Sequence, residues 1–134
     1  MKVLLDTHII LWALTDNEKL PKKARSIILD AENEIYYSLV SAWEVAIKHS
    51  IHPNQIPVSE KEFLNYCNQA GYLQLPLQEN HILSINTLHR TENAPKHNDP
   101  FDRMLISQAK SENIMFITHD SLIPFYNESC ILPV

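Results

Sequence analysis

The sequence predicts an α/β protein in which a mainly parallel sheet of about five strands lies between two layers of helices. Two observations lead to this class: short apolar runs alternate along the chain with helical patterns, and prolines stand at the boundaries between them. Strands that alternate with helices are typical of βαβ units, whose crossover helices cover both faces of a parallel sheet.

Five segments fit strands. KVLLD at residues 2–6, EIYYS at 34–38 and IMFIT at 114–118 are short, mostly apolar runs, as expected of strands buried on both faces. YLQL at 72–75 alternates between apolar and polar residues, and CILPV at 130–134 contains Pro133, which cannot donate to a neighbouring strand. We therefore expect these last two segments at the edges of the sheet.

Six segments between the strands have helical spacing: residues 8–14, 21–31, 39–51, 59–70, 78–89 and 100–112. Proline is excluded from helix interiors because it lacks the amide hydrogen that an interior position needs. The prolines that mark the boundaries of these segments are Pro21, Pro53, Pro57, Pro76, Pro95 and Pro100.

Length and composition limit the classes of function that the chain can have. A chain of 134 residues without a change in pattern is expected to form a single domain over residues 1–134. The net charge of −5 disfavours unspecific binding to nucleic acid, but it is compatible with a nucleic-acid enzyme whose acids are concentrated in a metal site. Gly71 is the only glycine, so glycine-rich phosphate-binding loops are excluded.

The cysteines and the N-terminus indicate the compartment. Cys67 and Cys130 lie far apart and outside any metal-binding spacing, which is typical of free thiols in a reducing compartment. Asp6 and His8 interrupt the apolar N-terminal segment too early for a signal peptide or a membrane span. We expect a cytoplasmic protein without membrane association.

Acidic residues follow two of the predicted strands. Asp6 comes directly after KVLL, and Asp120 comes two residues after MFIT. Ligands of an open parallel sheet bind beyond the carboxyl ends of the strands, so both carboxylates are expected at one edge of the sheet. Each also has a structural alternative, because an aspartate at such a position can cap the helix or turn that follows.

Glu44 lies in an otherwise apolar helical segment, SLVSAWEVAIK, where it forms a narrow polar stripe with Ser41 and Lys48. Two structural interpretations are open: a capping box from Ser41 to Glu44, and an ion pair between Glu44 and Lys48. A polar stripe on a mostly buried helix also suits a cleft, so Glu44 is a candidate for chemistry.

The segment HNDPFDRMLISQA contains two aspartates with different expected roles. Asp99 precedes Pro100, and proline is favoured at the first helical position, so Asp99 is the natural N-cap. Asp102 then shares a helix side with the apolar Leu105 and Ile106. A carboxylate at the edge of the core is unfavourable unless it is paired or bound to a metal, so we assign Asp99 to structure and Asp102 to chemistry.

Four segments together resemble the PIN-domain ribonucleases, and among them the VapC-type toxins of toxin–antitoxin pairs. These segments are LLDTHIILWAL around Asp6, SLVSAWEVAIK around Glu44, HNDPFDRMLISQA around Asp102 and MFITHD ending at Asp120. Their order and spacing fit over essentially the whole chain. The resemblance implies an α/β/α sandwich with strand order 3-2-1-4-5, in which Asp6, Glu44, Asp102 and Asp120 bind Mg²⁺ or Mn²⁺ for RNA hydrolysis.

The resemblance also implies supporting residues. Thr118 occupies a position where such proteins often carry a hydroxyl, and Asp99 is a candidate outer contributor to the metal site. Lys48 and Arg103 are candidate RNA contacts, with paired or solvated surface charge as the alternative. Oxygen ligands select Mg²⁺ or Mn²⁺ over zinc, and a metal so held activates water without a side-chain nucleophile.

The implied partners are an RNA substrate, a cognate VapB-like antitoxin and a second copy of the chain in a homodimer. Apolar residues in the early helical segments could serve either protein contact or the ordinary core; the candidates are Ile9, Trp12 and Leu20.

Three alternatives were weighed against the nuclease. A non-catalytic PIN-like module that binds RNA or protein would not need to keep four acids. A receiver-like phosphoacceptor domain would have paired acids at the first strand and a lysine after a late strand, and neither is present. A haloacid-dehalogenase-type phosphatase would need the pattern D-x-D, where this sequence has His8.

Overall fold

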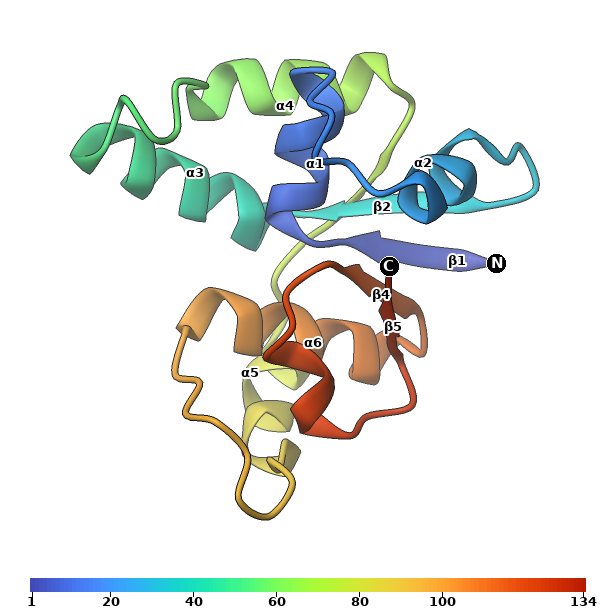
Figure 1. The fold of residues 1–134 in the computed structure, drawn as a ribbon, viewed down its shortest axis with the longest axis vertical. Helices are drawn as coiled ribbons and strands as arrows, with labels where there is room; N and C mark the ends of the chain where they lie inside the picture. Colours follow the sequence, from blue (N-terminus) through green and yellow to red (C-terminus); the bar gives the residue numbers. More distant parts are fainter.

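The sheet has five parallel strands in the order β3-β2-β1-β4-β5 (Figure 1). The computed structural model describes residues 1–134. The strands are β1 (Lys2–Leu5), β2 (Glu34–Ser38), β3 (Leu73–Leu75), β4 (Met115–Thr118) and β5 (Ile131–Pro133). The predicted α/β class and the strand order 3-2-1-4-5 are confirmed.

β1 is the central strand, and its Val3, Leu4 and Leu5 are fully buried. Leu4 is in register with Tyr36 of β2 on one side and with Phe116 of β4 on the other. The edge strands β3 and β5 have only three residues each. The alternation in YLQL and the proline in CILPV correctly indicated these edges, since an edge strand needs fewer apolar faces and fewer ladder hydrogen bonds.

Helices cover both faces of the sheet. They are α1 (Thr7–Leu14), α2 (Lys22–Leu29), α3 (Leu39–Ile51), α4 (Glu60–Gln69), α5 (Glu79–Ser84) and α6 (Pro100–Glu112). In Figure 1, α1 to α4 lie on one side of the sheet, and α5 and α6 lie on the other.

Two short 3-10 helices are the main departures from the predicted elements. The predicted helix at 78–89 changes after α5 into η1 (Ile85–Thr87). The unpredicted η2 (Ile123–Tyr126) follows β4 after a short turn, and the next residue, Asn127, has a φ of 50°. Asparagine tolerates this left-handed backbone better than most residues, and the segment is too short to show a helical period.

The two faces of the sheet build two hydrophobic cores. Successive side chains of a strand point to opposite faces, so Val3 and Leu5 join one cluster with α1, α2 and α4, while Leu4 joins the other with α6 and η2. Helix α3 contributes Val45 to the first cluster and Val40 to the second. α3 therefore lies at the seam between the layers, next to the start of α6.

The interpretation of Ile9 and Leu20 as candidate protein contacts is wrong. Both are buried in the first core, where they pack within the chain. Trp12 is half-buried and remains in reach of solvent.

Cys67 and Cys130 are free thiols, as predicted. None of the helices is long and apolar enough to cross a lipid bilayer.

Candidate metal centre

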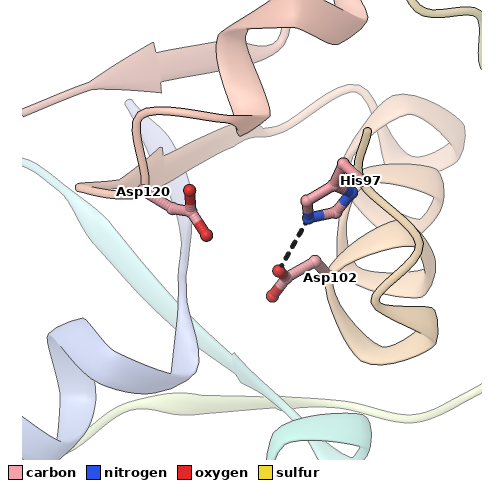
Figure 2. A group of neighbouring side chains, drawn as sticks. All are labelled: His97, Asp102 and Asp120. Carbon is pink, nitrogen blue, oxygen red and sulfur yellow. Dashed lines mark hydrogen bonds and ion pairs between the residues drawn. The ribbon is translucent and has the colours of Figure 1, made fainter. Parts of the chain in front are cut away.

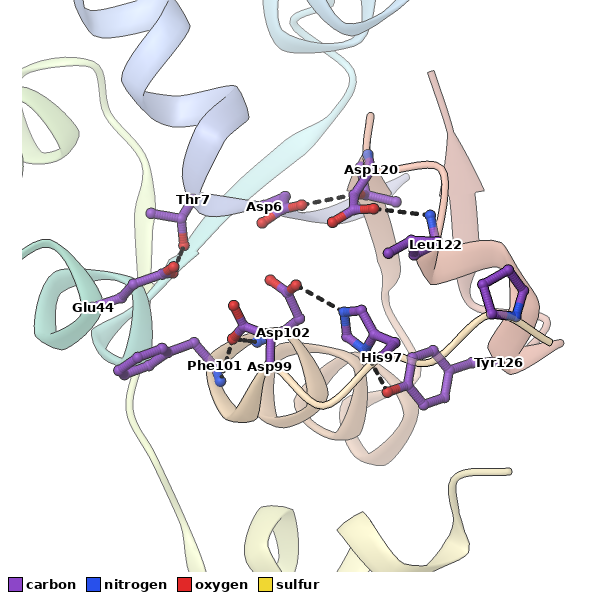
Figure 3. Close-up of polar contacts among 12 residues, drawn as sticks. Asp6, Thr7, Glu44, His97, Asp99, Phe101, Asp102, Asp120, Leu122 and Tyr126 are labelled. Carbon is purple, nitrogen blue, oxygen red and sulfur yellow. Dashed lines mark hydrogen bonds and ion pairs between the residues drawn. The ribbon is translucent and has the colours of Figure 1, made fainter. Parts of the chain in front are cut away.

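A cavity of about 280 Å³ opens at the carboxyl ends of β1 and β4, beside α1, α3 and the start of α6. Its walls combine acidic, basic and aromatic side chains, namely Asp6, His8, Trp12, Glu44, Lys48, Asp99, Asp102, His119 and Asp120. Figure 3 shows the acids facing one common space. The structure therefore brings together the four acids that the sequence singled out and places Asp99 beside them.

Asp6 enters the cavity where β1 ends and α1 begins. Asp6 stands at the N-cap position of α1, as the structural alternative expected, but its carboxylate makes no capping hydrogen bond. Instead, Thr118 Oγ1 on β4 donates a hydrogen bond to Asp6 Oδ2 over 2.8 Å. Asp6 is 5% exposed, and burial, with a further contribution from the charge of Glu44, raises its pKa to about 7.

Glu44 enters the cavity from α3 and is 3% exposed. Thr7 Oγ1 donates to Glu44 Oε1 over 2.7 Å and lies 2.8 Å from Ser41 Oγ. The capping-box interpretation is wrong, because α3 begins at Leu39 and Ser38 is its cap, which leaves Ser41 inside the helix. The predicted ion pair is confirmed, since Lys48 Nζ contacts Glu44 Oε2.

The two aspartates at the start of α6 have different surroundings, and the predicted cap at Asp99 is confirmed. Asp99 Oδ1 accepts hydrogen bonds from the backbone amides of Phe101 and Asp102, at 2.9 and 3.1 Å, and so caps the helix in front of Pro100. Asp102 is 9% exposed and projects into the cavity. Burial, together with the charges of the surrounding carboxylates, raises the pKa of Asp102 to about 8.

Asp120 has both a structural and a cavity-facing role. Its Oδ1 accepts a hydrogen bond from the backbone amide of Leu122 over 2.8 Å, which confirms the predicted turn cap. Its own amide donates to Thr118 Oγ1 over 3.1 Å. Asp120 is exposed, unlike Asp6 and Asp102, so it forms the open rim of the cavity.

The two candidate RNA contacts differ in position. Lys48 lines the cavity, and its side chain is 35% exposed. Burial alone would lower the pKa of Lys48, but the hydrogen bond and charge of Glu44 outweigh this and raise it. Arg103 is half-buried, forms no ion pair and does not line the cavity.

His97 belongs to the site and was not singled out from the sequence. Figure 2 shows its ring beside Asp102, with Nε2 3.0 Å from Asp102 Oδ2. Ligand atoms of His97, Asp102 and Asp120 all lie within 4.8 Å of one another. Burial and the charge of Arg90 lower the pKa of His97, which favours the neutral imidazole. The only signal in the sequence was its position two residues before the helix cap Asp99.

The donor set fits a hard divalent cation. Asp6, Glu44 and Asp102 are nearly inaccessible to solvent, and Lys48 is the one lysine or arginine on the cavity wall. Burial, and after it the repulsion among the acids, raises the pKa values of Asp6 and Asp102. Carboxylate oxygens are the ligands that Mg²⁺ and Mn²⁺ prefer, and a bound cation would relieve the repulsion among them.

The fold and the acidic cavity together define a class of protein. The sequence matches the PIN domain family over residues 3–125, and the chain belongs to this family. A search of curated protein sequences found no match.

Several solved structures share the fold of this chain. A chain in the crystal structure of VapBC2 from Rickettsia felis, bound to a DNA fragment from its promoter, is 19% identical with a TM-score of 0.68; the alignment covers 100% of this chain and 98% of the other. For VapBC-1 from nontypeable Haemophilus influenzae the identity is 16% and the TM-score 0.65, with 99% and 98% covered. FitAcB from Neisseria gonorrhoeae gives 18% and 0.63, with 97% and 96% covered.

Proposed function

We propose that residues 1–134 form one PIN domain that acts as an endoribonuclease dependent on Mg²⁺ or Mn²⁺, and that it is the VapC-like toxin of a toxin–antitoxin pair. The observation that carries this proposal is the convergence of Asp6, Glu44, Asp102 and Asp120 on one cavity in a PIN-family chain. Burying several carboxylates in one cavity lowers the stability of the fold, so such a cluster indicates a site that binds a cation or takes part in catalysis.

The residues of the chain prepare the cavity for metal-assisted hydrolysis of RNA. When bound, a hard divalent cation supplies an activated water and stabilises charge on the phosphodiester oxygens. Asp6, Glu44 and Asp102 would hold the cation, with Asp120 at the open rim where substrate and water enter. Thr118 holds one oxygen of Asp6 and leaves the other free to bind.

Thr7 and Lys48 have supporting roles in the cavity. Thr7 links α1 to α3 by donating to Glu44, so the carboxylate that enters from α3 is fixed relative to the Asp6 carboxylate at the end of β1. Lys48 places a positive charge on the cavity wall, where it can contact an RNA phosphate. We propose no RNA contact for Arg103 in the cavity itself, because it lies outside the wall.

The protein partners are proposed from the fold relatives and from one apolar surface. The similar chains come from VapBC and FitAcB structures. By analogy, we propose a VapB-like antitoxin that blocks the acidic cavity, and self-association into a homodimer. Trp43 is 59% exposed and borders an apolar hollow with Leu39 and Leu77, which offers a surface for such contacts.

The test is incubation of the purified protein with total RNA in Mg²⁺, in Mn²⁺ and in EDTA, followed by mapping of the cut ends. Cleavage is expected only with a divalent cation. Glu44→Gln should abolish it, whereas Glu18→Gln, the same change at an exposed acid outside the cavity, should leave it intact. Cation binding without cleavage of any RNA would favour the non-catalytic binding module instead.

A further inference from the structure

A chain of contacts runs from Arg90 to the acidic cavity through two buried rings. Tyr126 Oη lies 2.7 Å from His97 Nδ1, and His97 Nε2 lies 3.0 Å from Asp102 Oδ2 (Figure 3). The guanidinium carbon of Arg90 lies 4.6 Å from the centre of the Tyr126 ring. The chain joins the start of α6 and the loop before it to η2, and His97 and Tyr126 lie 29 positions apart in the sequence.

The directions of these hydrogen bonds follow from the chemistry of the groups. A carboxylate that binds a cation is ionised and can only accept, so in the cation-bound state the bond to Asp102 requires the proton on His97 Nε2. In a neutral imidazole, Nδ1 is then an acceptor, and the Tyr126 hydroxyl donates to it. By donating to Nδ1, Tyr126 stabilises the tautomer in which His97 presents a donor to Asp102.

The support behind His97 is rigid. Its side chain is 4% exposed, and its ring meets Tyr126 edge-on, with centroids 5.3 Å apart and planes at 89°. Arg90 lies against the Tyr126 ring and donates to the backbone carbonyls of Leu122 and Pro95. An imidazole held in this way has little freedom to turn away from Asp102.

A hydrogen-bond donor holds an oxygen of each of the three other candidate ligands. Thr118 holds Asp6, Thr7 holds Glu44, and the Leu122 amide holds Asp120. For Asp102, the donor is His97, which lies in the loop before α6. Without it, the Asp102 carboxylate would have no side-chain partner to select its rotamer.

We propose that His97 is a positioning residue for Asp102: it occupies Oδ2 and turns Oδ1 toward the cation, with Tyr126 fixing its tautomer. This inference rests on the proposed metal-dependent function. His97 is not proposed as a ligand, because Nε2 carries the proton that bonds Asp102 and has no free electron pair for a metal.

The effect should appear in the affinity for Mn²⁺, measured on the full chain by the electron paramagnetic resonance signal of free Mn²⁺. Loss of a side chain that orients a metal ligand weakens affinity by about 10- to 100-fold, and this is expected for His97→Ala. Tyr126→Phe, which keeps the ring and removes only the hydroxyl, should weaken binding less. His97→Gln places an amide donor near the original Nε2 and should recover part of the affinity.

The matched control is His89→Ala, which removes an exposed histidine of the same loop that makes no hydrogen bond. Thermal unfolding in EDTA should show that the variants remain folded; if His97→Ala does not, Tyr126→Phe and His97→Gln carry the test. Equal Mn²⁺ affinity in wild type and in the folded variants overturns the positioning role. A directly coordinated imidazole nitrogen, seen as ¹⁴N coupling in the pulsed spectrum of the Mn²⁺ complex, also overturns it.

The Mn²⁺ measurement distinguishes failure of the proposed function from failure of the positioning role. If the wild-type protein binds no Mn²⁺, the metal-dependent nuclease fails, and the role of His97 toward a metal fails with it. If wild type binds Mn²⁺ and the affinity of His97→Ala is unchanged, only the positioning role of His97 is lost.

Discussion

Replacing Asp6 by asparagine should stabilise the cation-free protein while removing its response to divalent cations. In the folded protein the pKa of Asp6 is about 7, compared with the ordinary value of 3.8 that applies in the unfolded chain. Between these values the unfolded chain has lost a proton that the folded protein still holds, so stability falls as the pH rises through this window. The Asp6→Asn variant carries no titrating group at this position and lacks this fall.

The magnitude follows from the pKa shift. Each pH unit inside the window changes the free energy of unfolding by about 1.4 kcal/mol per group. From about pH 5 to the folded pKa of about 7, wild type should therefore lose about 3 kcal/mol relative to Asp6→Asn. Asp102, whose pKa in the folded protein is about 8, also makes the stability of wild type fall as the pH rises. The charge of Asp6 contributes to this shift, and the Asp6→Asn variant lacks that charge.

The assay is urea unfolding in EDTA, followed by circular dichroism at about pH 5 and about pH 8. The control is Asp30→Asn, the same change at an exposed aspartate far from the cavity. If wild type and Asp6→Asn show parallel changes of stability with pH, the cavity does not impose the charge repulsion inferred for it. Added Mn²⁺ should stabilise wild type and leave Asp6→Asn unchanged; equal stabilisation of both would remove Asp6 from the metal site.

Three further predictions concern the same cavity. Mg²⁺ or Mn²⁺ at a hundred times its dissociation constant should raise the free energy of unfolding by about 2.7 kcal/mol, and no shift in a calorimetric melting curve would contradict a cation site in the folded state. Asp99→Ala removes the cap of α6 and should cost about 0.5–2 kcal/mol in urea unfolding; loss of Mn²⁺ affinity with unchanged stability would make Asp99 a ligand instead. Thr118 donates a hydrogen bond that lowers the pKa of Asp6, and Thr118→Val removes this donor. The pH profile of RNA cleavage should therefore move to higher pH in the variant. An unchanged profile would mean that the ionisation of Asp6 does not control the reaction.

Much of the fold was predictable because its determinants are local. The apolar run KVLL becomes the buried centre of the sheet, and the alternation in YLQL marks an edge strand. Pro100 and Asp99 set the start of α6 to the residue. The 3-10 helix η2 escaped prediction because four residues are too few to show a periodic pattern.

The sequence predicted which acids form the candidate site, but it did not predict which side chains surround them. Asp6, Glu44, Asp102 and Asp120 could be placed because each stands at a strand end, on a polar stripe or at a helix start. His97 could not be connected to them, since its partner Tyr126 lies 29 positions away and belongs to the unpredicted η2. The alternative of a capping box at Ser41 is wrong because the cap of α3 is Ser38, three residues earlier.

The sequence by itself determined the order of strands and helices, the edges of the sheet and the helix cap at Asp99, because apolar periodicity, proline and capping act between residues a few positions apart. Only the tertiary structure decided that Thr118 donates to Asp6, that Thr7 donates to Glu44 and that His97 lies beside Asp102. Those contacts join distant segments, and burial depends on everything that packs around a side chain. The raised pKa values of Asp6 and Asp102, and with them the case for a cation, follow from that burial.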